Sequence, residues 1–214
     1  MNVQEFPKIT VILRGYSYKQ IRLIVSILVK NGINSVEITM NTEKAAEIIK
    51  KIKTEFGEKI LIGAGTVTTM EEAKEAVNAG ATFILSPIML EKEILNFCKS
   101  KKVITVPGAF SPTEIIQSFR DGADIVKIFP ADRLGKKYIS DITAPLGELP
   151  VMVVGGINRE NVNDYFKSGA KYAGIASGIF NKEDILSENA ENLEKSLKDF
   201  INNLEIERGV KLYE

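Results

Sequence analysis

The chain has 214 residues, of which 44% are hydrophobic, and its 28 basic and 28 acidic residues cancel to a formal net charge of zero. It contains no histidine, which excludes Ser-His-Asp triads, histidine-bearing metal sites and histidine general bases. The length suits a single domain of the size of an α/β barrel, and the balanced charge gives no general electrostatic attraction to nucleic acid or to an anionic membrane surface.

Short runs rich in β-branched residues alternate with longer segments of helical period. The predicted strands, in chain order, are residues 9–14, 35–40, 60–63, 83–86, 103–106, 125–129, 151–154 and 172–176. Between the first of them, residues 19–30 and 43–56 place apolar side chains at helical spacing and predict surface helices that cover a sheet. Helical segments stop at glycines that precede the next strand, namely Gly32, Gly80, Gly122 and Gly169.

Eight strands separated by helices predict an α/β fold, the (β/α)8 TIM barrel, as one domain over residues 1–214. A doubly wound open sheet has the same alternation, but we find no second domain and no dinucleotide fingerprint. The GAG run at residues 63–65 is followed by Thr68 where that fingerprint requires a third glycine. From about residue 202 the chain is highly charged, which predicts a solvated tail or an arm that contacts another subunit.

The single cysteine, Cys98, supplies neither a disulfide framework nor a thiolate cluster for a metal. Residues 1–8 are polar and lack the apolar core of a secretory signal, and no apolar run approaches the roughly 18 residues of a membrane span. We therefore expect a cytoplasmic protein with neither a membrane nor a nucleic-acid partner.

One ammonium group, that of Lys127, stands among β-branched and aromatic residues in the sixth predicted strand. From the middle of such a strand the side chain does not easily reach bulk water, and loss of solvation lowers the pKa of a lysine. A neutral amine attacks carbonyl groups and forms Schiff bases. The alternative is a structural lysine that extends out of the barrel end or pairs with a buried carboxylate.

A single carboxylate, that of Glu37, occupies a comparable place in the second predicted strand. If both side chains point inward, Glu37 and Lys127 share a pocket near the carboxyl ends of the strands, where barrel enzymes keep their active sites. Glu37 would then perform the proton transfers of a Schiff-base mechanism, since a chain without histidine needs a carboxylate for them. The alternative is a buried salt bridge without a catalytic role.

Two further polar residues follow predicted strands. Arg14 ends the first strand, where its guanidinium would bind a carboxylate or phosphate with two hydrogen bonds, or form an ion pair at the barrel end. Thr66 follows the third strand beside glycines that permit close backbone approach. Its hydroxyl would bind a substrate carboxylate, or cap the helix expected to start near Thr69.

Glycine-rich loops follow the last two strands. Gly155 and Gly156 come directly after the seventh strand, and Ser177 and Gly178 follow the eighth. In barrels, the loops after strands seven and eight often hold a phosphate with backbone N–H groups. Taken with Lys127, this placement suggests carbon–carbon bond chemistry on a phosphorylated keto compound.

The chain also resembles a known enzyme family over residues 9 to about 180. The shared motifs lie at residues 36–39 (VEIT), 63–67 (GAGTV), 85–87 (LSP), 106–108 (VPG), 126–130 (VKIFP) and 155–157 (GGI). In this order and spacing they resemble the class I aldolases that act on 2-keto-3-deoxy-6-phosphogluconate and on 4-hydroxy-2-oxoglutarate.

The resemblance implies roles for individual residues. It implies that Lys127 forms a Schiff base with pyruvate, that Glu37 handles the protons, and that Thr66 and Pro107 line the pyruvate pocket. It further implies that Gly155, Gly156 and the loop of Ser177 and Gly178 bind the phosphate. A homotrimer without metal or cofactor is also implied.

Two positions depart from the gluconate enzymes. Asn41 stands where those enzymes usually carry arginine, and Val154 where they usually carry threonine before the glycine pair. Both residues are similar to the branch that cleaves 2-keto-3-deoxy-6-phosphogalactonate, the epimer at the carbon where the new bond forms. Losing the arginine and the threonine removes groups that would bind the carboxylate and orient the C4 hydroxyl, and Arg14 would supply the missing cation.

We therefore predict a class I aldolase that reversibly cleaves a 2-keto-3-deoxy-6-phospho sugar acid, of the gluconate or galactonate type, to pyruvate and glyceraldehyde 3-phosphate. The alternatives are activity on 4-hydroxy-2-oxoglutarate, a phosphosugar isomerase or epimerase without a covalent intermediate, and a barrel that binds a phosphorylated ligand without turnover.

Overall fold

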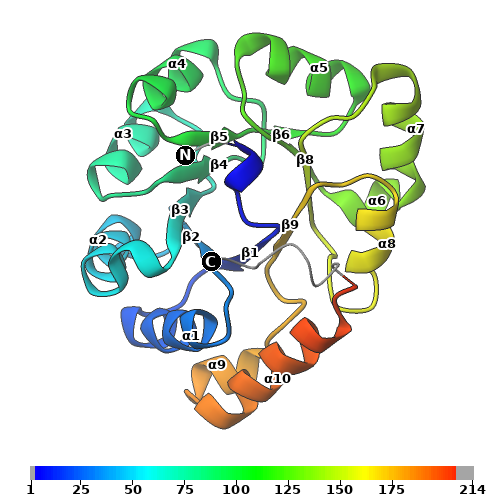
Figure 1. The fold of residues 1–214 in the computed structure, drawn as a ribbon. Coiled ribbons are helices and arrows are strands. Elements are labelled where there is room, and N and C mark those ends of the chain that lie inside the picture. The colour runs from blue at the N-terminus through cyan, green and yellow to red at the C-terminus, as the bar shows by residue number, and fades with distance from the viewer. Residues whose placement is uncertain (1–2, 206–214) are drawn as a thin grey trace.

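The computed structural model of the protein describes residues 3–205 and places nine strand segments in a ring surrounded by helices (Figure 1). The segments are β1 (Ile9–Leu13), β2 (Ser35–Thr39), β3 (Leu61–Gly65), β4 (Phe83–Leu85), β5 (Ile104–Val106), β6 (Gly108–Ala109), β7 (Val126–Ile128), β8 (Val151–Val154) and β9 (Tyr172–Ile175). Neighbours pair in parallel in the order β5-β4-β3-β2-β1-β9-β8-β7-β6. The predicted (β/α)8 barrel is confirmed.

The ninth segment arises because Pro107 divides one strand into β5 and β6. Proline has no N–H to donate to a strand ladder. On the β5 side, the N–H of Ile125 donates to the carbonyl of Thr105 at 3.1 Å. At the break, the N–H of Lys127 donates to the carbonyl of Pro107 at 2.8 Å. These bonds connect the divided strand to β7 along its length and complete the ring.

Most strand ends lie within one residue of the prediction, and the carboxyl end of β3 differs by two. Arg14 lies just beyond β1, and β3 extends to Gly65 instead of ending at residue 63. Glycine has a low strand propensity, which is why the sequence read as a loop there. The pairing of Gly65 with Thr39 of β2 extends the ladder.

Ten α-helices and two short 3-10 helices are present among residues 3–205. They are α1 (Tyr18–Lys30), α2 (Ala45–Phe56), α3 (Met70–Asn78), α4 (Lys92–Ser100), α5 (Pro112–Asp121), α6 (Ala131–Leu134), α7 (Lys137–Leu146), α8 (Val162–Lys167), α9 (Lys182–Leu186), α10 (Ala190–Asn203), η1 (Val3–Glu5) and η2 (Gly57–Lys59). No helix in this range is long and apolar enough to cross a membrane.

Both helices predicted from periodicity are present as α1 and α2. A capping box of Ser17 and Gln20 starts α1. The predicted helix at 43–56 begins two residues later, at Ala45, because Lys44 adopts a left-handed conformation with φ 57°. The four predicted helix stops have left-handed φ angles of 77°, 99°, 107° and 109° at Gly32, Gly80, Gly122 and Gly169 respectively.

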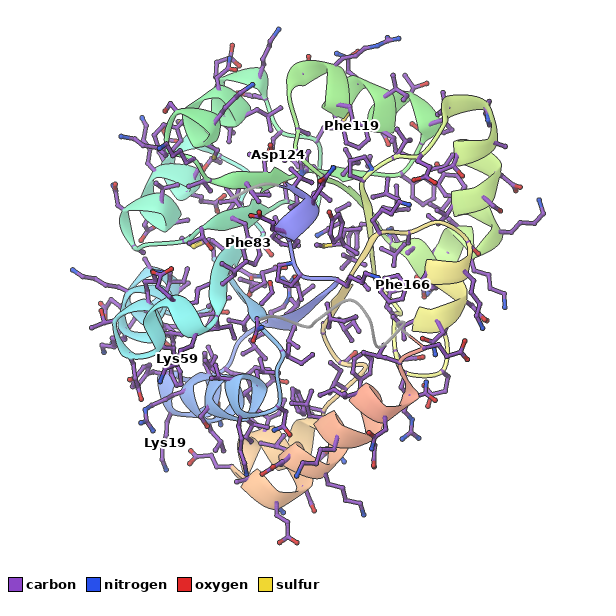
Figure 2. The ribbon with its side chains drawn as sticks, viewed as in Figure 1. Lys19, Lys59, Phe83, Phe119, Asp124 and Phe166 are labelled. Atoms are coloured by element: carbon purple, nitrogen blue, oxygen red, sulfur yellow. The ribbon has the colours of Figure 1, made fainter. Side chains whose placement is uncertain are left out.

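The buried side chains form an outer layer between the strands and the helices and an inner cluster inside the ring. Figure 2 shows Phe83 inside the ring and Lys19 on the outer helices. Phe6 joins the inner cluster and makes edge-to-face contacts with Phe83 and Tyr172, with centroids 5.1 and 5.5 Å apart. The Tyr172 hydroxyl donates to the carbonyl of Val3 at 2.7 Å. Because Phe83 and Tyr172 begin their strands, η1 and Phe6 close the amino end of the barrel.

The expected charged tail begins inside α10, which ends at Asn203. Its remaining part, from residue 206 onward, lies outside the described residues.

Candidate active site

Lys127 and Glu37 both point to the interior of the barrel. Lys127 lies in β7 between Val126 and Ile128, which both belong to the outer layer. The same alternation in β2 turns Glu37 inward. Lys127 is 6% exposed and Glu37 is 2% exposed, so the barrel interior contains two ionisable groups of opposite sign.

Burial shifts the pKa values of both groups toward their neutral forms. Desolvation raises the pKa of the Glu37 carboxyl, and the positive charges of Lys127 and Arg14 oppose that rise. Desolvation lowers the pKa of the Lys127 ammonium, the Glu37 charge opposes the fall, and Arg14 adds to it. Burial therefore shifts the lysine toward the unprotonated amine that a nucleophile needs and the glutamate toward the protonated carboxyl that a proton donor needs.

The carboxylate of Glu37 is held by packing. A Cβ atom built on Gly65 would lie 1.4 Å from Glu37 Oε1, so the side chain occupies space that only glycine leaves open. Its other oxygen, Oε2, is buried and has no hydrogen-bond partner among residues 3–205. A buried carboxylate oxygen without a partner costs free energy, and such groups are common where a substrate or water completes the contacts.

Aromatic and backbone contacts surround Lys127. Its Nζ lies 4.6 Å from the ring centroid of Phe129, a cation–π distance when the amine is protonated. The carbonyl of the buried Pro107 accepts the backbone N–H of Lys127, so Pro107 lies directly beside the lysine. Gly108 pairs with Lys127 across the two strands, and a Cβ there would lie 2.6 Å from the backbone of Pro87.

Arg14 is exposed at the carboxyl end of β1 and acts on both buried groups through its charge. The next residue, Gly15, donates its N–H to Thr42 Oγ1 at 2.9 Å. Thr42 Oγ1 also lies 3.0 Å from Thr39 Oγ1, and both threonines are buried. Neither threonine was predicted from the sequence to belong to the site. The two-residue period of β2 does indicate that Thr39, like Glu37, faces inward. The contact of Thr42 with Gly15 depends on loop conformation, which the sequence does not reveal.

Thr66 directly follows β3 and is half-buried, with a left-handed φ of 58°. The helix-capping alternative for Thr66 is wrong, because the cap of α3 is Thr69. The Thr69 hydroxyl accepts from the N–H of Glu72 at 3.2 Å. The hydroxyl of Thr66 is therefore left for another role at the carboxyl end of the barrel.

The two glycine loops lie against each other. Gly155 and Gly156 have left-handed φ angles of 95° and 71°. A Cβ on Gly178 would lie 2.2 Å from the carbonyl oxygen of Ile157, so the loop after β9 packs directly on the loop after β8. Ser177 is exposed beside them. Within residues 3–205, no hydrogen bond engages the N–H groups of Gly156, Ser177 or Gly178, which leaves these donors open to an anion.

These N–H groups belong to the loops and not to a helix N-terminus, because α8 and α9 begin only at Val162 and Lys182. The side chain of Asp132 also reaches this place, with its Cβ 2.5 Å from the position of a Cβ on Gly156. An anion held here would therefore have one carboxylate nearby.

The two positions that separate the epimer-specific branches lie in different surroundings. Asn41 is exposed, one residue after Met40, whose N–H donates to the carbonyl of Gly65 at 2.8 Å. Val154 is 5% exposed at the end of β8 and belongs to the inner cluster. Asn41 thus offers a polar group on the side of Glu37, whereas Val154 offers an apolar wall.

No group of three or more cysteine, aspartate and glutamate residues within the described part of the chain is arranged to hold a metal ion.

Comparisons with known proteins agree with this geometry. Residues 2–196 match the family model described as KDPG and KHG aldolase. A probable 2-dehydro-3-deoxy-6-phosphogalactonate aldolase from Rhizobium meliloti is 32% identical over 170 residues, covering 79% of this chain and 80% of that protein. A 2-dehydro-3-deoxy-phosphogluconate aldolase from Haemophilus influenzae is 32% identical over 175 residues, covering 81% and 82%.

Solved structures have the same fold. One described as native KDPGal is 27% identical with a TM-score of 0.80, covering 94% of this chain and all of that one. A KDPG aldolase from Legionella pneumophila, solved with pyruvate captured as a covalent carbinolamine, has a TM-score of 0.84 at 24% identity, covering 92% and 96%. At 24% identity, the likeness to the Legionella pneumophila structure shows that the two chains share a fold.

Proposed function

Because the chain belongs to the family of KDPG and KHG aldolases, we propose that Lys127 is the amine through which it acts and Glu37 the group that moves the protons. KDPG is 2-keto-3-deoxy-6-phosphogluconate and KHG is 4-hydroxy-2-oxoglutarate. The protein is a carbon–carbon lyase, a class I aldolase that reversibly cleaves a 2-keto-3-deoxy-6-phospho sugar acid to pyruvate and glyceraldehyde 3-phosphate. The observation that carries the assignment of roles is the pair of buried ionisable groups, one amine and one carboxyl, on β7 and β2.

The proposed reaction begins at the substrate ketone. The unprotonated Nζ of Lys127 attacks C2 and forms a carbinolamine. Glu37 then donates a proton to the carbinolamine hydroxyl, which leaves as water. The resulting iminium draws the electron pair of the C3–C4 bond as that bond breaks. Glu37 accepts the proton of the C4 hydroxyl, so that the aldehyde leaves. The remaining enamine takes a proton at C3, and hydrolysis of the iminium releases pyruvate and free Lys127.

The other proposed contacts follow from position. Thr66 directly follows Gly65, which packs on Glu37, and the carbonyl of Pro107 accepts the backbone N–H of Lys127. These positions support a pyruvate pocket there. The open N–H groups of Gly156, Ser177 and Gly178 support a phosphate site in the two glycine loops, with Gly155 shaping the turn.

The side chains near the C4 hydroxyl support a preference for the galactonate epimer. Asn41 replaces a cation with a neutral amide, Val154 provides no hydroxyl, and Arg14 contributes the remaining positive charge. Comparing kcat/KM for the two epimers tests this proposal, and a higher value for the gluconate substrate would overturn it.

The isomerase alternative finds less support. It requires a charged Lys127 that stabilises an enediolate, whereas burial lowers the pKa of this ammonium group. A phosphosugar isomerase would also leave no covalent trace on the lysine.

Reduction of the Schiff base tests the assignment. The protein is incubated with pyruvate and borohydride, weighed intact and mapped by peptide mass spectrometry. We expect one reduced pyruvate on Lys127, no adduct in Lys127→Ala, and an unchanged adduct in Lys171→Ala, a surface lysine paired with Glu148. A folded wild-type protein that gains no adduct would overturn the proposal.

We also infer that the working form is a homotrimer in the cytoplasm. Ile88 and Phe110 are 54% and 46% exposed, and their loops are adjacent because Gly108 donates its N–H to the carbonyl of Ile88. Covering two such side chains with another copy removes apolar surface from water. Light scattering should give the mass of three chains, and Phe110→Glu should lower it.

Phosphorylated sugar acids do not cross bilayers unaided, which supports the cytoplasm as the place of reaction.

A further inference from the structure

One hydrogen bond connects the loop that carries Arg14 to the loop that follows β2. The N–H of Gly15 donates to Thr42 Oγ1 at 2.9 Å, and among residues 3–205 it is the single hydrogen bond between residues 14–17 and 40–44. The Thr42 side chain is in turn 3.0 Å from Thr39 Oγ1 on β2. The position of the first loop is therefore set from the strand that carries Glu37.

The threonine pair is built to hold that bond. Thr39 is 0% and Thr42 5% exposed, so water does not readily displace the hydroxyl of either threonine. Because Thr42 Oγ1 accepts from Gly15, its own proton is free for Thr39 Oγ1, or it accepts a second proton from that hydroxyl. Gly15 has a left-handed φ of 75°, which allows the chain to turn immediately after Arg14.

The hydrogen bond between Gly15 and Thr42 matters because Arg14 directly precedes Gly15 in the chain. Arg14 acts through its charge on both groups of the reacting pair, and it favours the unprotonated amine at Lys127 and the ionised carboxylate at Glu37. An exposed arginine on a loop has this effect only while the loop holds it near the barrel mouth, since an exposed charge is otherwise screened by water and salt.

We propose that Thr42 is a positioning residue that fixes the Arg14 loop to β2 and thereby holds the Arg14 charge against Lys127 and Glu37. The proposal deepens the proposed function and rests on it for the importance of these two groups. Thr42 itself touches neither of them in the contacts described above. The charged groups that act on Lys127 are Glu37 and Arg14, while its strand neighbours Gly108 and Met152 are uncharged.

The test measures the Lys127 amine without using any substrate. Competitive labelling with acetic anhydride at a series of pH values, read by peptide mass spectrometry, follows the fraction of unprotonated Lys127. In Thr42→Val the acceptor for Gly15 is lost and Arg14 moves away. The labelling midpoint of Lys127 should then move to higher pH, and labelling at a fixed pH below that midpoint should fall by about threefold. Thr42→Ser keeps the acceptor and should label like the wild type.

A second variant shows whether Thr42 acts through Arg14. Arg14→Met should shift the labelling midpoint in the same direction as Thr42→Val, and the double variant should shift no further than Arg14→Met alone. An unshifted midpoint in Arg14→Met overturns the proposal even if Thr42→Val does not fold. Additive shifts overturn it as well.

The borohydride experiment keeps this test separate from the proposed function. If wild-type protein forms no pyruvate adduct while the labelling shifts occur as expected, the reaction assignment is wrong and the positioning by Thr42 stands. If the adduct forms and Thr42→Val leaves the midpoint unchanged, the positioning is wrong and the aldolase assignment stands.

Discussion

The carboxylate of Glu37 lies over the Cα atom of Gly65, with Oε1 1.4 Å from where a side chain on that glycine would begin. The two residues lie on neighbouring paired strands, β2 and β3. The absence of a side chain on Gly65 therefore sets where the Glu37 carboxylate, the proposed proton-transfer group, can lie.

Gly65→Ala should displace the Glu37 carboxylate and reduce turnover by about 10²- to 10⁴-fold, the usual contribution of a positioned acid–base group. Overpacking should also lower the free energy of unfolding by about 1–3 kcal/mol. Steady-state kinetics and urea denaturation measure the two effects. The double variant with Glu37→Gln should be no slower than Glu37→Gln alone, and a further large loss would show that Gly65 acts elsewhere.

Glu37→Gln should separate amine chemistry from proton transfer. The Glu37 charge raises the pKa of Lys127, so its removal lowers that pKa and extends labelling of the Lys127 amine by acetic anhydride to lower pH. Turnover should nevertheless fall by about 10²- to 10⁴-fold. Labelling and cleavage are measured over the same pH series, with Glu148→Gln as a surface control. A variant that still cleaves at the wild-type rate contradicts the role of Glu37.

Ser177→Ala should affect phosphorylated substrates selectively. The substitution keeps the backbone N–H and removes the exposed hydroxyl beside it. Loss of a hydrogen bond from that hydroxyl to the phosphate costs about 1 kcal/mol, which corresponds to about a fivefold rise in KM. The KM for unphosphorylated 4-hydroxy-2-oxoglutarate should stay unchanged. Ser140→Ala, which removes an exposed hydroxyl on α7, is the matched control. An equal rise for both substrates would place Ser177 outside the phosphate site.

Cys98 should be unreactive in the folded protein. It is fully buried, and desolvation raises the pKa of its thiol to about 12. Because the thiolate is the reacting form, iodoacetamide at pH 8 should modify Cys98 only after denaturation, and activity should survive the treatment. Mass spectrometry of native and denatured samples measures this, and rapid native modification would contradict the burial.

The shared interior position of Lys127 and Glu37 could be predicted from sequence because strands have a period of two. Lys127 and Glu37 each interrupt an apolar run, and a charge in such a run either faces a shared interior or is not tolerated. The barrel followed from the same alternation of strands and helices.

Other features depend on backbone conformation that the sequence does not reveal. Thr66 and Thr69 both precede α3, and the choice between them as helix cap depends on dihedral angles: Thr69 is extended with φ −129° and Thr66 is left-handed. The division of a strand at Pro107 and the contact between Thr42 and Gly15 likewise required the folded chain.

The pairing of β1 has a consequence for how the enzyme is made. β1 lies between β2 and β9, and Phe6 packs on Tyr172 at the start of β9. A ribosome delivers β1 early, but its second neighbour leaves the exit tunnel only after residue 175 has been added. The strand that precedes Arg14 is therefore enclosed on both sides only after most of the polypeptide has been translated. A nascent chain that lacks β9 has no complete barrel on which to catalyse.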